Sequence, residues 1–229
     1  MEPRAATPPL KDVLPYRKPK RGRDYWVVDN VLPNPEEVAE RCLSKQDWMM
    51  GAPWKPEVWP GIRSPNALSP EELAKVEARV QKETGVKSLY QDNMRGKMAL
   101  SHNHVQIVGA KESVSKPHVD ALALCNFAAV IYLHPNPPKH TGTSFYRLRL
   151  GPGRLGGNLC PAGCFNLVEA LGVRQVPVDA WELDLELENA FNRLVVYRAD
   201  LVHSATAYFG TEDKRSKRMT IVFFWKAVV

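Results

Sequence analysis

The sequence predicts a mostly β protein with flanking helices. Two amphipathic helix patterns occur within the first 85 residues, and from Lys97 onward the chain changes to short apolar or alternating runs separated by glycines and prolines. Helices that precede a run of strands typically pack as a layer on one face of a sheet. We therefore expect an N-terminal helical layer over a β core.

Composition is typical of a soluble globular protein. The chain has 229 residues, of which 44% are hydrophobic and 24% charged. This length is sufficient for one sizeable core, so we expect a single domain over residues 23–229. No apolar run approaches the roughly 20 residues that span a bilayer, and the first residues lack the apolar core of a secretory signal. We expect a cytoplasmic protein that does not associate with a membrane.

Residues 1–22 read as a basic, proline-rich tail. The run from Arg17 to Arg23 carries much of the net charge of +6. Such runs can contact nucleic acid or an anionic partner. We favour a solvated, disordered leader, because the segment has few apolar residues to bury.

Both helix predictions rest on capping signals. Asn34 is a candidate N-cap, with Pro35 in the first helical position and acidic residues in the first turn. Ser69 begins a second helix with Glu72 three residues later, which is the capping-box pattern, and Gly85 marks its end.

The strand predictions follow β-branched, aromatic and alternating runs. They cover residues 24–29, 98–101, 104–108, 122–133, 143–150, 192–197, 203–208 and 218–225. Residues 151–177 are rich in glycine and too long for a hairpin turn, which favours a lid or binding loop. Residues 178–188 alternate acids with apolar residues, and we lean towards a helix there.

Three groups of tryptophan, histidine and cysteine residues can be interpreted either as structural residues or as functional ones. Trp48, Trp54 and Trp59 could stack on a substrate, but tryptophans among prolines more often cover a sheet edge. His102 and His104 have metal-like spacing without a following carboxylate, so we favour strand histidines. For Cys160 and Cys164 a metal site or a disulfide stays open, and we favour reduced thiols. Cys42 and Cys125 are isolated in the sequence.

The segment with the clearest chemical meaning is Lys116–Asp120. In a strand, residues i and i+2 project from the same face, so His118 and Asp120 can converge on one ion while Val119 points away. A third ligand must come from a remote segment, and His203 follows an apolar run that ends in a turn. Two imidazoles and one carboxylate leave three positions of an octahedron open, which suits non-haem iron(II).

The ordered set of motifs resembles the iron(II)/2-oxoglutarate dioxygenases. Those enzymes share a His-x-Asp pair, a strand, a glycine-bearing turn, a distal histidine and a basic residue that begins the next strand. The chain is similar to an uncharacterised bacterial branch of that superfamily, a domain of unknown function, over roughly residues 24–225. The shared motifs are PGIRS (60–64), PHVD (117–120), GTSFYR (142–147) and FNRLVVY (191–197). The resemblance implies a double-stranded β-helix core, the jelly-roll or cupin-like fold.

The resemblance also implies the co-substrate and its ligands. Iron(II) would be held by His118, Asp120 and His203, with 2-oxoglutarate converted to succinate while a substrate is hydroxylated by dioxygen. A distal carboxylate suits the planar fork of Arg218, and Thr220 faces the same side. Arg215 is an alternative anchor in what reads as a solvated turn. Ser144 aligns with a hydroxyl that such enzymes direct at the co-substrate, and Tyr132 is a further candidate contact, for which core packing stays open.

The retained Asp120 argues against halogenation, which needs a small residue there. Arg147 and Asn192 are expected to contact the substrate, and residues 151–177 fall where such enzymes carry a variable insert over the iron.

Three functions remain open at this stage. The first is an oxygenase that hydroxylates a small molecule, such as an amino acid or a peptide-derived metabolite in a biosynthetic route. The second is a nucleic-acid oxygenase, which the basic tail favours but which lacks a base-reading motif. The third is a non-catalytic metal-binding barrel module. The sequence does not indicate the oligomeric state.

Overall fold

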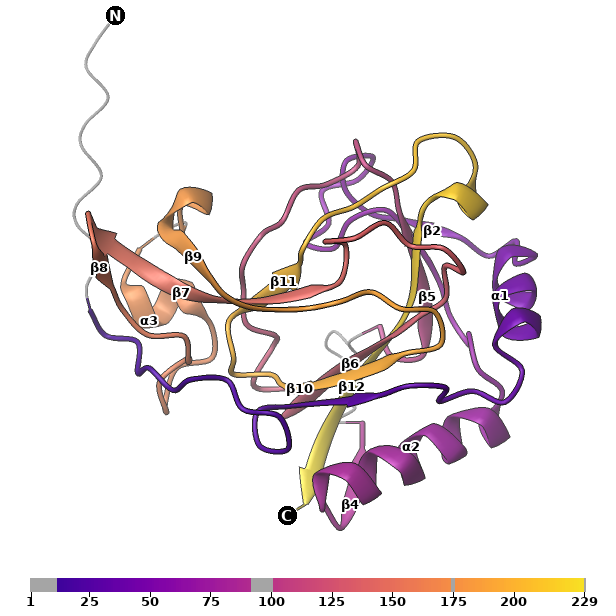
Figure 1. The fold of residues 1–229 in the computed structure, drawn as a ribbon, viewed down its shortest axis with the longest axis horizontal. Helices are drawn as coiled ribbons and strands as arrows, with labels where there is room; N and C mark the ends of the chain where they lie inside the picture. Colours follow the sequence, from indigo (N-terminus) through magenta and orange to yellow (C-terminus); the bar gives the residue numbers. More distant parts are fainter. Residues whose placement is uncertain (1–11, 92–100, 174–175, 229) are drawn as a thin grey trace, which may run out of the picture.

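Two antiparallel sheets build the molecule in the computed structural model, which describes residues 12–91, 101–173 and 176–228 (Figure 1). The large sheet has the order β1-β10-β6-β12-β5-β3-β2, with β4 beside β12. Its strands are β1 (Tyr25–Val28), β2 (Met49–Met50), β3 (Ile62–Ser64), β4 (Ser88–Tyr90), β5 (His104–Val108), β6 (Phe127–Tyr132), β10 (Leu194–Arg198) and β12 (Arg218–Val228). In the small sheet, β7 (Thr143–Gly151) pairs with β11 (His203–Ala205), β8 (Arg154–Leu155) and β9 (Trp181–Leu187).

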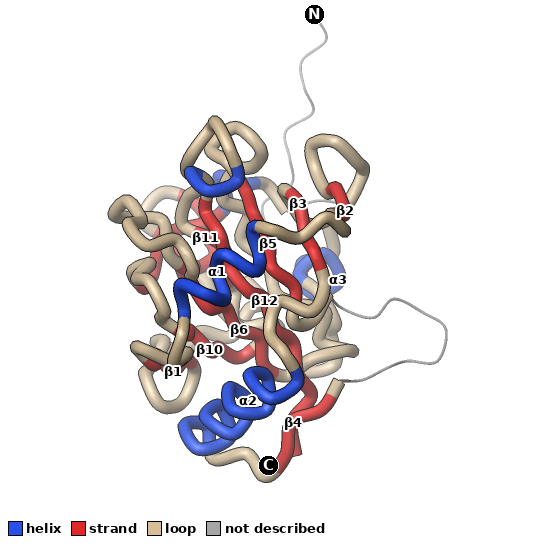
Figure 2. The backbone as a smooth tube through the Cα atoms, turned by 90° about the vertical axis from the view of Figure 1, so that its right-hand side faces the viewer, coloured by secondary structure: helices blue, strands red, loops and turns tan. Residues whose placement is uncertain are grey.

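The helical layer covers the outer face of the large sheet. Figure 2 shows α1 (Pro35–Leu43) and α2 (Pro70–Thr84) in front of its strands. Val38 of α1 and Val76 and Val80 of α2 pack with outer-face side chains such as Ile131 and Ile221 in one core cluster. The predicted mostly β fold with flanking helices is therefore confirmed.

The predicted helix ends follow the capping signals. Both hydrogen bonds of the capping box are formed by Ser69 and Glu72, and Gly85 ends α2 with a φ of 76°. Pro35 occupies the first turn of α1, although Asn34 makes no side-chain capping bond. Side-chain capping thus positions α2, whereas at the start of α1 only the proline signal is realised.

The inner face of the large sheet packs against the small sheet. Apolar residues such as Val130 and Val222 meet Phe145 of β7 there. The same face carries a polar row, because Tyr132 pairs with Thr220, Thr220 with Gln106, and Gln106 with Arg63. Residues that pair across strands project from the same side of a sheet. The space between the sheets therefore holds polar groups at one end.

One secondary-structure prediction is wrong. Residues 178–188 form a short 3-10 turn, Val178–Ala180, followed by strand β9. Its alternating acids and leucines have a period of two, which matches a strand that pairs with β7. Two further predicted strands are shorter than expected: β6 begins at Phe127 and β11 ends at Ala205. Of the predicted strand 98–101, residues 98–100 lie outside the described residues.

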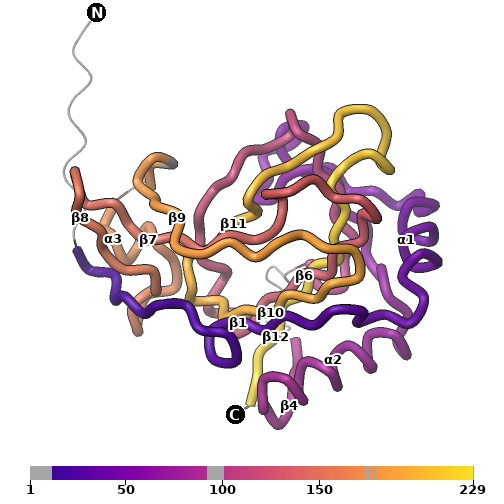
Figure 3. The backbone as a smooth tube through the Cα atoms, viewed as in Figure 1, coloured from indigo at the N-terminus to yellow at the C-terminus, as the bar shows by residue number. Residues whose placement is uncertain are grey.

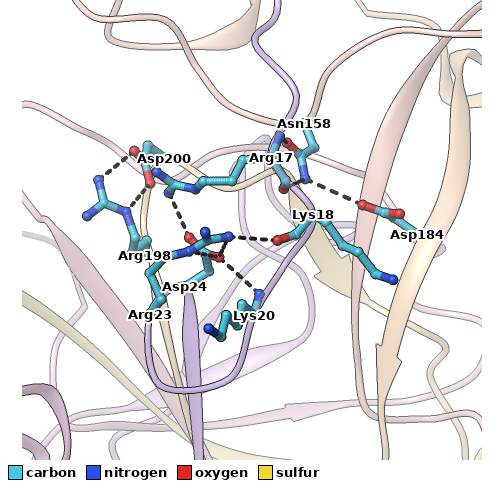
Figure 4. Close-up of polar contacts among 9 residues, drawn as sticks. All are labelled: Arg17, Lys18, Lys20, Arg23, Asp24, Asn158, Asp184, Arg198 and Asp200. Atoms are coloured by element: carbon cyan, nitrogen blue, oxygen red, sulfur yellow. Dashed lines mark hydrogen bonds and ion pairs between the residues drawn. The ribbon is translucent and has the colours of Figure 1, made fainter.

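The described part of the expected disordered tail is packed against the domain (Figure 3). Leu14 is 4% exposed, and a side chain at Gly157 would meet the Leu14 carbonyl oxygen at 1.9 Å. Figure 4 shows Arg17 and Arg23 paired with the buried Asp24, and Asn158 hydrogen-bonded to the Arg17 backbone. Residues 12–22 are therefore ordered, which corrects the prediction for this part. Residues 1–11 lie outside the described residues.

Candidate metal centre

Three side chains that are distant in the sequence meet at the mouth of the space between the sheets. Nε2 of His203 lies 3.4 Å from Oδ2 of Asp120, and Nε2 of His118 lies 3.8 Å from Oδ1 of the same carboxylate. One ligand atom from each residue lies within 4.8 Å of the other two. The structure thus brings the predicted triad together.

Backbone pairing places these ligands. His118 and His203 form an isolated antiparallel bridge, in which each backbone N–H donates to the carbonyl of the other at 2.9 Å. The Asp120 N–H donates to the Ala199 carbonyl at 3.1 Å. The expected iron strand is therefore a single bridge and not a full strand. The extended backbone is sufficient to send Val119 to the opposite side, where it joins an apolar cluster with Val202.

Helix α3 (Leu167–Leu171) supports the ligand segments from behind. Leu167 and Leu171 belong to the same apolar cluster as Val119 and Val202. Because Val119 alternates with the two ligands, this cluster lies on the side away from their side chains. Residues 151–177 were expected to form an insert over the iron. Helix α3, which belongs to this segment, instead packs behind the ligand residues, so the expectation is wrong for this part.

Both imidazoles are held in one tautomer. Nδ1 of His118 lies 2.8 Å from the Lys116 carbonyl, and Nδ1 of His203 lies 2.8 Å from the Leu201 carbonyl. A carbonyl only accepts, so Nδ1 of each ring carries the proton and Nε2 keeps its lone pair. Burial lowers the pKa of His203 to about 4, against the opposing effect of Asp120. His203 is therefore neutral at physiological pH, as a metal ligand must be.

The carboxylate provides the test of whether a metal fits. Oδ2 of Asp120 is buried and has no hydrogen-bond partner within the described chain. An unpaired buried carboxylate oxygen is costly, and the two imidazole nitrogens that face the Asp120 carboxylate carry lone pairs and cannot donate to it. A divalent cation satisfies all three groups at once. His118 is 54% exposed on its side-chain surface, so the centre is open to solvent on that side.

A second set of polar groups lies deeper on the inner face. Arg218 is 4% exposed and donates to the carbonyls of Thr141 (3.0 Å) and Gly142 (3.3 Å), without an acidic partner among the described residues. Thr220 is 1% exposed and its hydroxyl has no partner there. The Arg218 guanidinium lies 5.4 Å from the centre of the Tyr132 ring. A buried cation beside an unpaired hydroxyl fits a carboxylate ligand.

The other predicted co-substrate contacts are engaged with neighbours. The Tyr132 hydroxyl bonds that of Thr143 at 2.7 Å, and Ser144 bonds Thr206 at 2.7 Å. Tyr132 and Thr143 lie in the space between the sheets, whereas Ser144 alternates with Phe145 along β7 and projects from the other face of the small sheet. Burial raises the pKa of Tyr132, partly offset by Arg218, so its phenol keeps its proton. Arg215 forms an exposed ion pair with Glu40 and is not an anchor.

The two predicted substrate contacts make contacts within the protein. Arg147 lies over the Tyr16 ring at 3.7 Å and donates to the Gly156 carbonyl. Both amide atoms of Asn192 bond the backbone of Leu32 at 2.8 Å. These contacts hold the N-terminal segments, and substrate contact by either residue stays a prediction. The sequence could not show the contacts with Tyr16 and Leu32, because these residues are more than 100 positions away.

The remaining conspicuous side chains are placed as follows. All four cysteines are free. Trp48 packs beside the outer core, Trp54 is 46% exposed, and Trp59 lies against Arg63. His102 lies in a turn and packs edge-on against the stacked rings of Phe223 and Trp225, and His104 is a strand residue whose Nδ1 lies 2.7 Å from the His102 carbonyl. Within the described ranges, the triad is the one group of acids, histidines or cysteines that could hold a metal.

Two side chains near the site were given no role from the sequence. Arg63 lies in the PGIRS motif and is 9% exposed on the inner face. The centre of the Tyr208 ring lies 5.8 Å from the Arg218 guanidinium. For Arg63 the sequence offered one signal, a charged residue within a motif that contains a glycine turn. Nothing in the sequence indicated Tyr208.

Solved structures with a similar fold include non-haem α-ketoglutarate-dependent enzymes. The carbocyclase SnoK from nogalamycin biosynthesis aligns with a TM-score of 0.58 and 14% identity, over 91% of this chain and 81% of its own. The epimerase SnoN from the same pathway aligns with a TM-score of 0.55 and 17% identity, over 89% of this chain and 79% of its own. SnoN has also been solved with Fe3+, α-ketoglutarate and nogalamycin RO, and that structure aligns at 0.51. The predicted jelly-roll fold is therefore confirmed.

The sequence itself assigns the family. Residues 14–152, more than half of the chain, match the model described as "Family of unknown function (DUF6445)", and the chain belongs to that family. No curated protein matches the sequence. The fold and the family agree with the resemblance drawn from the motifs. No helix in the described ranges is long and apolar enough to cross a membrane.

Proposed function

We propose that the protein is an iron(II)/2-oxoglutarate-dependent oxygenase that hydroxylates a small molecule. The observation that carries this proposal is that two groups of buried polar atoms lie together between the sheets without partners in the described chain. Oδ2 of Asp120, within the triad of His118, Asp120 and His203, has no hydrogen-bond partner there, and neither has the Thr220 hydroxyl beside the buried Arg218. A metal chelated by a dicarboxylate would satisfy both groups.

The overall reaction joins 2-oxoglutarate, dioxygen and R–H to give succinate, carbon dioxide and R–OH. Iron(II) with 2-oxoglutarate supplies the oxidising chemistry when bound. The two imidazoles and Asp120 hold the metal and leave positions free for ligands. Arg218 fixes the distal carboxylate through its guanidinium fork, and the Thr220 hydroxyl donates to the same group. The solvent-exposed His118 side gives the substrate a route of entry.

The nucleic-acid alternative has weaker support. Arg17 and Arg23 of the basic run are both paired with Asp24 (Figure 4), and their hydrogen bonds fix the N-terminal segment. These cations therefore serve a structural purpose, which reduces the charge left for phosphates. Turnover of 2-oxoglutarate that is stimulated by random RNA or DNA and lost at high salt would favour this alternative.

The test is spectroscopic and chemical. Anaerobic protein mixed with iron(II) and 2-oxoglutarate should develop a visible chelate band, and admission of air should yield succinate. His203→Ala should abolish both, because two ligands cannot hold the metal. His140→Ala is the matched control, because His140 is exposed and pairs with Glu186. Wild-type protein that binds iron without a chelate band would support the non-catalytic module.

A further inference from the structure

Arg63 is a buried cation that forms no ion pair with an acid among the described residues. It is 9% exposed, its Nε has no partner, and the described residues give it neither a hydrogen bond nor an ion pair. Burying an unpaired guanidinium is costly. Arg218, the comparable buried arginine, is held by two backbone carbonyls. Stability alone does not account for Arg63.

Its position directs the side chain into the site. Arg63 of β3 pairs with Gln106 of β5, and Gln106 pairs with Thr220 of β12, so the three share the inner face. Asp120 and Tyr208 both act to raise the pKa of Arg63, while burial lowers it to about 10. The guanidinium is therefore charged at neutral pH and within electrostatic reach of a proposed metal ligand.

The loop before β3 provides one wall. The Trp59 ring lies 4.8 Å from the Arg63 guanidinium. Gly51 donates to the Gly61 carbonyl at 2.8 Å and Ala52 to the Trp59 carbonyl at 3.0 Å, which holds the loop closed. A side chain at Gly51 would meet the Trp59 ring at 2.4 Å. Stacking covers one face of a guanidinium and leaves its in-plane donors for a bidentate anion.

We propose that Arg63, backed by Trp59, binds a carboxylate of the primary substrate, so that the substrate is a small organic acid. This inference rests on the proposed oxygenase function. The distal carboxylate of 2-oxoglutarate is assigned to Arg218, and β3 lies two strands from β12, or about 10 Å at the usual strand spacing. Arg218 and Arg63 therefore define two anion subsites, one for the co-substrate and one for the substrate.

The experiment measures binding and avoids turnover. Protein loaded with zinc and 2-oxoglutarate is titrated calorimetrically with N-acetylated amino acids and with their primary amides. The wild type should bind the best acids at least about tenfold more tightly than their amides, as expected for charged hydrogen bonds. Arg63→Met should lose this preference. Arg63→Lys should retain part of it, because the charge remains without the fork.

Controls separate recognition from folding. Arg79→Met removes the same charge from an exposed position of α2 and should keep the preference. The metal-free Arg63→Met protein should unfold at the same or a higher temperature, because an unpaired buried charge is removed. A lower melting temperature with an intact acid preference would make Arg63 structural and overturn the proposal.

Two further results would also overturn it. Acids and amides that bind the wild type equally would contradict a carboxylate subsite. A 2-oxoglutarate affinity that falls in Arg63→Met as far as in Arg218→Met would assign Arg63 to the co-substrate. Failure of the oxygenase proposal is recognised separately, by the absence of the chelate band with iron.

Discussion

The two faces of the large sheet differ sharply in how their buried groups are satisfied. On the outer face, residues such as Ile107, Ile131 and Ile221 are 0% exposed and pack against the helices. On the inner face, Arg63 Nε and the Thr220 hydroxyl are buried without partners in the described chain. The outer face is packed by the protein itself, whereas the inner face keeps buried polar groups that the described chain leaves without partners.

This difference arises from the alternation of a strand. Ile221 and Thr220 are consecutive, yet one belongs to the helix-covered core and the other to the site. A substitution on the outer face should therefore change the free energy of unfolding and leave binding unchanged. A substitution of an unpaired polar residue on the inner face should weaken binding without lowering the free energy of unfolding.

The largest effect is expected for Ile221→Ala. Removing the buried side chain leaves a cavity in the outer core, which should lower the free energy of unfolding by about 2–5 kcal/mol. Urea denaturation measures this change. Metal affinity of the folded protein should stay the same. Val168→Ala, at a position that is 42% exposed, is the control and should cost little. A metal affinity that falls together with stability would show that the two faces are not independent.

Arg218→Met should weaken 2-oxoglutarate binding about 10–100-fold, because a charged hydrogen-bond donor is lost from a buried anion site. Titration of the chelate band measures this affinity, and iron affinity without co-substrate should be unchanged. Arg215→Met is the control. Arg215 lies three residues before Arg218 in the sequence but is paired with Glu40, so its loss should leave 2-oxoglutarate affinity unchanged. Equal loss in both variants would contradict the anchor assignment.

The outer face should also control acid stability through His102. Burial lowers the pKa of His102 to about 4 from an ordinary value of 6.5. Between these values the unfolded state binds a proton that the folded state excludes, so stability is greatest above pH 6.5 and falls as pH decreases towards 4. The slope should be up to about 1.4 kcal/mol per pH unit.

The metal-free wild type and His102→Gln, unfolded in urea at several pH values, provide the comparison. The difference isolates His102 from His203, whose pKa is also lowered to about 4. The variant should show a shallower decline below pH 6.5. Parallel curves would show that His102 does not titrate with folding.

The smallest effect is expected for Thr220→Val. Replacing an unpaired buried hydroxyl with a methyl group should raise the free energy of unfolding by about 1 kcal/mol, and 2-oxoglutarate affinity should fall a few-fold. Thr143→Val is the matched control, because the Thr143 hydroxyl is bonded to Tyr132 and its loss should lower stability. A loss of stability in Thr220→Val would indicate a partner for that hydroxyl within the protein.

Sequence patterns predicted most of the architecture and the proposed ligands. The caps of Ser69 and Asn34 and the alternating runs predicted the helices and strands of the two-sheet core. The His-x-Asp pair with a distal histidine indicated the cluster that the structure assembles. The N-terminal segment was misjudged because its anchor, Asn158, is 141 residues from Arg17.

The sequence by itself determined the side chains that can bind a metal and the period-two pattern that puts Arg218 and Thr220 on one face. These are local properties of residue type and spacing. Only the tertiary structure decided which buried polar groups have partners. Arg147 and Asn192 proved to be satisfied, whereas Arg63 did not. The physical reason is that hydrogen-bond partners across sheets and loops are supplied by strands far apart in the chain, whose pairing a linear pattern does not contain.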